Sequence, residues 1–184
     1  MATEHGRELQ LTNDTIVNVA ALLREPVGSS RDYALHLDAF PLGEEAVAEQ
    51  VDGHVKLTRL RDSVMAAIRA HGTVDLECVR CLRTYEQGFE TEFTEQFRQT
   101  VDLRTGVSLD NAEAFDADAF TISENHELDF GEVLRQEILL ALPMRPDCGD
   151  TCPGPDLTEA GEAGAVDERL AALSRLLEDQ GTTS

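Results

Sequence analysis

Residues 85–101, YEQGFETEFTEQFRQTV, place an apolar side chain at every fourth position. Between residues 90 and 100 every even-numbered position is polar. On a helix of 3.6 residues per turn, steps of four drift by about 40° each, so this apolar stripe would spread around the axis. A strand keeps one parity on one face. The pattern therefore predicts a half-buried antiparallel strand, with Tyr85, Phe89, Phe93, Phe97 and Val101 facing inward.

The same period of two extends upstream, through residues 51–78 and again at residues 33–37, and it predicts further strands there. Gly72 lies between two such runs and suggests a bulge or bend. Residues 16–24, IVNVAALLR, suggest a short helix capped by Asn13 or Asp14. A brief strand is expected at residues 120–122.

The clearest helical pattern covers residues 129–142. Asp129 and Glu132 have the spacing of a capping box, an apolar stripe follows, and Pro143 ends the pattern. Together these elements predict the α+β fold class: a curved antiparallel sheet, either open or closed like a barrel, packed with a few helices.

A chain of 184 residues can form one compact domain with a tail. We expect a single α+β domain over residues 1–152. Residues 153–184 are expected to form an acidic linker and a C-terminal helix at 167–179 with leucines on one face. Residues 106–118 are expected to form a surface loop.

The charge balance is strongly acidic, with 15 Lys and Arg against 36 Asp and Glu, a formal net charge of −21. Such a protein is repelled by nucleic acid and anionic membranes and attracted to basic partners. The longest apolar run, at 138–144, is too short to span a bilayer. No signal peptide is visible, so we expect a cytoplasmic protein that has no membrane contact and whose cysteines are reduced or metal-bound.

All four cysteines fall into two close pairs, Cys78–Cys81 and Cys148–Cys152. A close pair on a turn lets two thiolates bind one ion, and two such pairs complete a tetrahedral zinc site. A site with four protein ligands leaves no open position for catalysis. The spacing therefore predicts a structural zinc that ties the sheet to the far end of the main helix.

Two other interpretations stay open. Cys78 and Cys81 could form a cytosolic dithiol redox pair, although that motif normally opens a helix in a βαβ unit and here it lies between strand-like runs. The segment 105–129, rich in Asp and Glu, could be the docking surface of an acidic protein-interaction module. The sequence contains no G-x-S-x-G, Walker loop or H-E-x-x-H, so we expect neither an enzyme nor a small-molecule substrate.

Several segments, in order, resemble the YceD family of large ribosomal RNA subunit accumulation proteins. They are VNVAALLR at 17–24, LECVRC at 76–81, LDFGEVLRQEILLALP at 128–143, the cysteine pair beyond it, and DERLAAL at 167–173. The resemblance implies a bacterial protein that is needed for 23S ribosomal RNA accumulation and large ribosomal subunit biogenesis, without a known enzymatic activity. Many relatives carry a further cysteine after the helix, which the stretch following Cys152 lacks.

The charge distribution bears on the partner within the large subunit. Residues 54–84 contain six basic residues against three acidic ones, a net of +3, inside a chain of −21. Arg80 and Arg83 are expected to offset thiolate charge, with phosphate contact as the other reading. No aromatic side chain lies among these basic residues as a stacking platform would require. We therefore expect a basic ribosomal or assembly protein as the direct partner, in preference to naked RNA.

Overall fold

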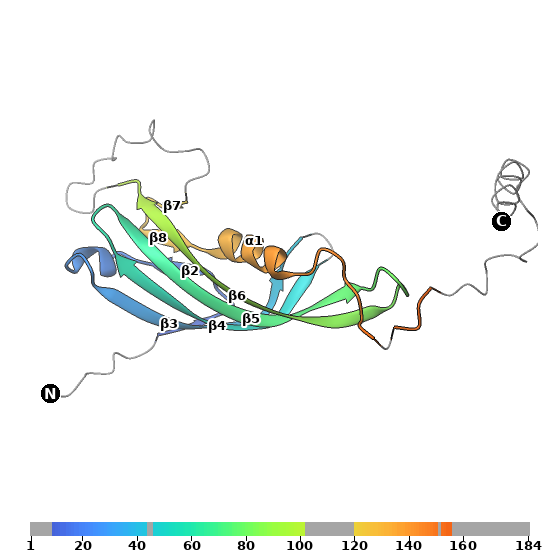
Figure 1. Ribbon diagram of the computed structural model, residues 1–184. Coiled ribbons are helices and arrows are strands. Elements are labelled where there is room, and N and C mark those ends of the chain that lie inside the picture. The colour runs from blue at the N-terminus through green and yellow to red at the C-terminus, as the bar shows by residue number, and fades with distance from the viewer. Residues whose placement is uncertain (1–8, 44–45, 102–119, 151, 156–184) are drawn as a thin grey trace, which may run out of the picture.

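The computed structural model describes residues 9–43, 46–101, 120–150 and 152–155, and a single curled sheet dominates them (Figure 1). Four long strands form its centre: β3 (Ser30–Pro41), β4 (Val47–Arg59), β5 (Ser63–Glu77) and β6 (Thr84–Gln99). They are antiparallel neighbours joined in chain order. Because each strand twists and the twist accumulates, the sheet curls into a half-barrel.

Two short strands lie at the two edges of this sheet. The strand β1 (Leu9–Thr12) pairs in parallel with β3, and β7 (Thr121–Ile122) pairs in parallel with the end of β6. A separate two-stranded sheet joins β2 (Ile16–Asn18) to β8 (Glu127–Asp129). A single turn of 3-10 helix, η1 (Leu22–Arg24), and one α-helix, α1 (Gly131–Ala141), complete the described elements.

The α+β fold class that we expected is wrong. The described residues are mostly sheet, with one α-helix, and the large sheet mixes parallel margins with an antiparallel centre. One cause is the segment 16–24, where β2 and the single 3-10 turn η1 take the place of the predicted α-helix. Val17 pairs with Leu128 across β2 and β8, and both side chains are buried. Asp14 accepts a hydrogen bond from the backbone N–H of Ile16, two residues on, which forms a turn that leads into a strand.

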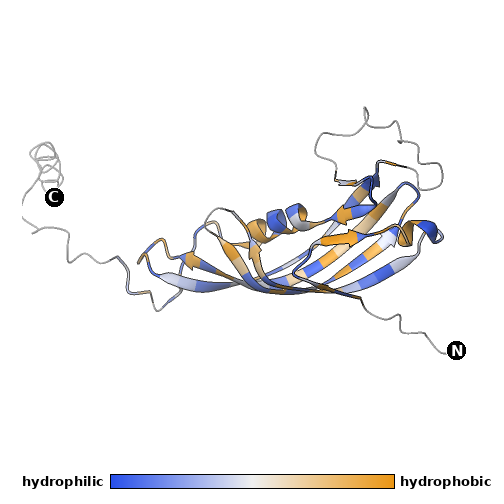
Figure 2. Ribbon diagram, turned by 180° about the vertical axis from the view of Figure 1, so that it is seen from behind, coloured by the Kyte–Doolittle hydropathy of each residue, from blue (hydrophilic) through white to orange (hydrophobic). Residues whose placement is uncertain are grey.

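The alternation of residues 85–101 predicts β6 correctly. Phe89, Thr91 and Phe97 are buried on the inner face, while the even-numbered residues of the strand are exposed. Figure 2 shows the resulting bands of hydrophobic and hydrophilic residues along the strands. The tilted rings of Phe97 and Phe120 lie 5.7 Å apart, so the end of β6 packs against the chain that enters β7.

A bulge interrupts the pairing of β4 with β5 near the beginning of β4. Gln50 and Val51 of β4 together face the single residue Gly72 of β5, and Gln50 has a positive φ of 50°. A Cβ on Gly72 would lie 3.0 Å from the carbonyl oxygen of Glu49. The predicted irregularity at Gly72 is therefore present, but the extra residue belongs to the neighbouring strand.

The helix α1 covers the inner face of the half-barrel and packs against β6. Its apolar stripe is buried through Val133, Leu134 and Ile138, and each such side chain contributes about 1.5–3 kcal/mol on burial. Leu142 is extended (φ −73°, ψ 147°) because the ring of Pro143 disfavours helical backbone in the residue before it. The helix and its end are as predicted.

The start of α1 differs from the predicted capping box. Phe130 is the N-cap residue and has no side-chain cap. The carboxylate of Asp129 accepts hydrogen bonds from the Gly131 N–H (2.8 Å) and the Thr15 hydroxyl (2.9 Å). Glu132 instead contacts Arg135 at 2.6 Å. The carboxylate of Asp129 therefore joins the first turn of α1 to Thr15, which is distant in sequence.

Residues 105–119, including most of the predicted acidic docking segment and the predicted surface loop, lie outside the described residues, as does the predicted C-terminal helix.

Candidate metal centre

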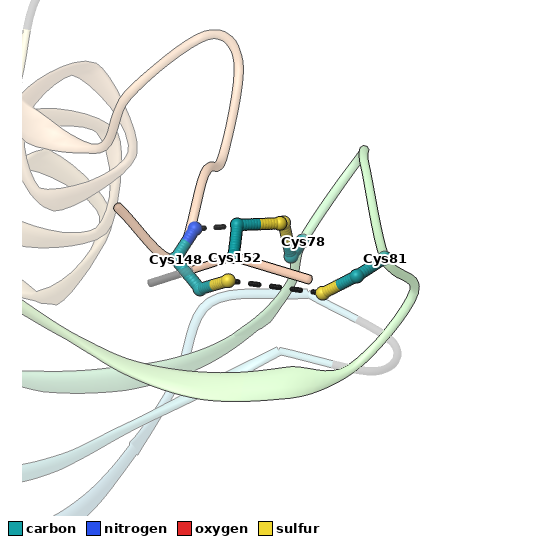
Figure 3. Close-up of side chains that lie close together, drawn as sticks. All are labelled: Cys78, Cys81, Cys148 and Cys152. Carbon is teal, nitrogen blue, oxygen red and sulfur yellow. Dashed lines mark hydrogen bonds between the residues drawn. The ribbon is translucent and has the colours of Figure 1, made fainter. Parts of the chain in front are cut away.

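The two cysteine pairs come from different parts of the fold. Cys78 and Cys81 lie in the loop between β5 and β6, at the far tip of that hairpin, and Cys148 and Cys152 lie in the segment after α1. Figure 3 shows the four side chains gathered at this point. The helix α1 runs along the sheet and ends toward the hairpin tip, so the chain that leaves it reaches the first cysteine pair within a few residues (Figure 1).

The first pair sits on a tight turn. The Leu82 N–H donates to the carbonyl of Cys78 (2.9 Å), and the Cys78 N–H donates to the carbonyl of Arg83 (2.9 Å). Leu82 has a positive φ of 58°, which lets the chain reverse into β6. Because Cys78 and Cys81 occupy the two sides of this turn, their side chains can both face the segment after α1.

The second pair sits on a turn of its own. The Gly149 N–H donates to the Asp147 carboxylate (2.8 Å), and the Cys152 N–H donates to the Gly149 carbonyl (3.1 Å). Gly149 has a φ of 88°, a conformation that glycine adopts without strain. The sequence Asp147-Cys148-Gly149 thus carries a turn signal that sequence analysis can find.

The four sulfur atoms lie within 4.8 Å of one another. The Cys78 and Cys152 sulfurs are 3.8 Å apart, and those of Cys81 and Cys148 are 3.7 Å apart. A tetrahedron with zinc–sulfur bonds of about 2.3 Å has sulfur–sulfur edges of about 3.8 Å. A disulfide needs about 2.05 Å. The donor set and its spacing therefore fit a tetrahedral zinc ion, and the structure brings together all four residues that the sequence singled out.

The thiol groups influence each other's ionisation. The backbone N–H of Cys148 points at the Cys78 sulfur (3.5 Å) and, with the N–H groups of Arg80 and Cys81, lowers the pKa of Cys78 to about 6. Burial and then the neighbouring sulfurs raise the pKa of Cys148 to about 12. Four thiolates this close repel one another, so a divalent cation would stabilise the fully ionised set.

Two contacts beside the sulfurs, which sequence reasoning missed, align the two turns. The Val79 N–H donates to the carbonyl of Pro146 (3.0 Å), and the Arg80 guanidinium contacts the Asp147 carboxylate (3.2 Å). The carboxylate, followed by the Cys152 and Cys78 sulfurs, raises the pKa of Arg80. Arg80 is thus paired with Asp147 beside the cluster, and the expected offset of thiolate charge by Arg80 and Arg83 stays a prediction.

The fold and this cluster define a class of protein: a small half-barrel sheet with a helix on its inner face and four converging cysteines at one end. The chain belongs to the YceD family. The model of that family, described as large ribosomal RNA subunit accumulation protein YceD, matches residues 66–177, which is more than half of the chain and includes all four cysteines. The resemblance seen in the sequence is thus confirmed. No curated protein and no solved structure matches the chain.

In the described part of the chain, no helix is both long enough and apolar enough to cross a membrane.

Proposed function

We propose that this protein is a non-catalytic factor needed for 23S ribosomal RNA to accumulate, and hence for biogenesis of the large ribosomal subunit in the cytoplasm. The observation that carries the proposal is the family match over residues 66–177, because the family description ties its members to large-subunit ribosomal RNA. The match covers most of β5, all of β6 and α1, and both cysteine pairs. The matched residues therefore include the β5–β6 hairpin, the helix α1 and the cysteine cluster that lies between them.

We assign a structural role to the cysteine cluster, with Cys78, Cys81, Cys148 and Cys152 as the ligands of one zinc ion. Four sulfur ligands fill a tetrahedral site and leave no position for substrate or water. The ion would hold the segment after α1 against the tip of the β5–β6 hairpin. Four ligands suffice, so the further cysteine found in many relatives is not needed here.

The direct partner is a basic protein of the large subunit or its assembly intermediates. A net charge of −21 opposes contact with naked RNA, which carries a dense negative charge, and favours the Lys- and Arg-rich surfaces of proteins that bind RNA. Neither a membrane nor a small-molecule substrate has a role in this proposal.

The test is depletion of the protein in its own host, followed by complementation. Depletion should lower the ratio of 23S to 16S ribosomal RNA and shift large-subunit particles toward lighter precursors in sucrose gradients. The wild-type gene should restore both, and a variant with Cys78 and Cys148 replaced by serine should restore them poorly. Unchanged ribosomal RNA and particles on full depletion would show that the proposed function is wrong.

The redox alternative has one observation in its favour, the lowered pKa of Cys78, since a reactive dithiol needs a readily formed thiolate. Two observations oppose it. The short sulfur–sulfur distances run between the pairs, from Cys78 to Cys152 and from Cys81 to Cys148, and the segment after Cys81 leads into β6 and not into a helix. Metal analysis separates the two functions. One zinc per chain in protein purified without added metal supports the structural site, whereas a reversible Cys78–Cys81 disulfide in metal-free protein supports the redox pair.

The acidic-module alternative concerns residues 105–129. Deleting 106–118 tests it directly, because unchanged partner capture after the deletion would remove this segment from the interface.

A further inference from the structure

The margin of the large sheet along β6 is open over most of its length. The strand runs from Thr84 to Gln99, but β7 pairs with it only at Arg98 and Gln99. On its other side β6 pairs with β5 without interruption from Thr84 to Arg98. Figure 1 shows β7 meeting only the end of β6. Residues 84–97 thus form an edge strand in the described structure.

The direction of the backbone groups along this edge can be derived from its end. The Arg98 N–H donates to the carbonyl of Phe120 on the β7 side, while the Gln99 N–H donates to Asp62 on the β5 side. Successive residues of a strand point their backbone groups to opposite sides. The even-numbered residues of β6 therefore direct their N–H and C=O groups toward the open margin.

Two of these marginal groups are bonded by neighbouring side chains. The Gly88 carbonyl accepts a hydrogen bond from the Gln87 amide (2.8 Å), and the Gln96 N–H donates to the Glu95 carboxylate (2.9 Å). Between them, Glu90, Glu92 and Thr94 have no backbone partner on this side among the residues described. The helix α1 packs against β6 through side chains and supplies no such partner.

This edge lacks most of the features that usually block strand addition. Natural edge strands are protected by proline, by bulges, by short length, by charged side chains (lysine above all) or by a covering helix or loop. Here β6 has no proline, its register with β5 contains no bulge, and its exposed charges along this stretch are acidic. Glu86 and Glu90 are exposed, as is Glu92, which contacts Arg69 at 2.8 Å. Another copy of the same edge would bring like charges face to face, whereas a basic strand would be attracted.

We propose that the β6 edge between Gly88 and Gln96 binds an extended, basic segment of a partner protein as an added strand. Main-chain hydrogen bonds to Glu90, Glu92 and Thr94 would provide affinity and fix the register of the added strand. The acidic side chains on the outer face would favour Lys or Arg at alternate positions of the partner segment. The inference deepens the proposed function because it gives the basic partner a surface and a binding mode, and it rests on that function for the partner's identity.

The test uses the purified full chain and a synthetic peptide of about nine residues in which Lys and Val alternate, which spans roughly 30 Å when extended. A control peptide replaces each Val by Pro, so it keeps the charge but cannot pair as a strand. We expect saturable binding of the Lys-Val peptide, with NMR amide shifts centred on Glu90, Glu92 and Thr94. Equal binding of the Pro peptide, or shifts centred elsewhere, would overturn the proposal.

Three variants sharpen the test. Thr94→Pro removes an edge N–H that β5 does not use, so the fold should persist while peptide affinity falls roughly tenfold. Glu90→Lys should weaken binding roughly threefold, and Glu49→Lys, an equal charge change on β4, should leave it unchanged. Unaltered peptide affinity in both β6 variants would refute the proposal that the β6 edge is the binding site. So would self-association of the wild-type chain that Thr94→Pro abolishes, because a second copy would then be the occupant.

The two proposals can fail separately. Peptide binding is measured on purified protein and does not depend on ribosomal RNA levels. If the peptide binds but depletion leaves ribosomal RNA unchanged, the β6 binding site is supported and the proposed function is wrong. If depletion has its effect but the peptide does not bind, only the edge proposal is wrong.

Discussion

Replacing Cys78 by serine should release the segment after α1 from the β5–β6 hairpin. Besides the sulfur cluster, the described contacts between these parts include the hydrogen bond from Val79 to Pro146 and the ion pair between Arg80 and Asp147. The hydrogen bond is worth about 1 kcal/mol, and the ion pair, which is open to solvent, adds little to stability. We therefore expect the metal to supply most of the stability of this attachment.

The size of the effect follows from linkage between metal binding and folding. Zinc at a thousand times its dissociation constant stabilises the folded state by about 4 kcal/mol. For a chain of this length, each kcal/mol corresponds to about 2–4 °C in Tm, so losing the ion should lower Tm by about 8–16 °C. Cys78 is fully buried, but the main apolar cluster, which includes Phe97 and Phe130, contains no cysteine, so the sheet and α1 should remain folded at room temperature.

Three measurements check this prediction: zinc content by mass spectrometry, thermal unfolding by circular dichroism, and hydrogen exchange over residues 144–152. Exchange in that segment should become fast in Cys78→Ser and in chelator-treated wild type. Val79→Ser tests a serine in the same turn without loss of a ligand, since Val79 is exposed. Chelator-treated wild type tests loss of the ion without a new hydroxyl at the buried Cys78 position. A Cys78→Ser protein that keeps one zinc per chain and the wild-type melting curve would refute the reasoning.

Two further predictions concern the sheet. Gly53→Ala should lower the free energy of unfolding by roughly 1–3 kcal/mol, because a Cβ there would lie 2.3 Å from the carbonyl oxygen of Arg69. Gly88→Ala is the control: a Cβ there meets nothing within 4 Å, so the free energy of unfolding should change little. Urea unfolding of the two variants checks this prediction. The hydrogen bond to Asp52 at 2.6 Å raises the pKa of His36 above 6.5, so Asp52→Asn should return it toward 6.5 in an NMR titration. Because the folded pKa is raised, the stabilisation by this pair is present below pH 6.5 and is lost as pH rises through the folded value; a His36 titration that Asp52→Asn leaves unchanged would contradict the assignment.

The sequence by itself determined the elements whose signal is local and periodic. The two-residue period of 85–101 fixed β6 and its inner face, because a strand with one buried face must alternate. The apolar stripe before Pro143 fixed α1 and its end, since proline restricts its own backbone and that of the residue before it. The two cysteine pairs also identified the candidate ligands, because the chemistry belongs to the side chains.

Only the tertiary structure decided how distant segments meet. Residues 16–18 have an ambiguous apolar pattern, and they form a strand because β8, more than a hundred residues later, offers hydrogen bonds and the buried side chain of Leu128. The convergence of Cys78 with Cys148, the bulge opposite Gly72 and the open margin of β6 likewise depend on which strands become neighbours. A local pattern sets the period of a segment, but its pairing depends on partners that the local pattern does not specify.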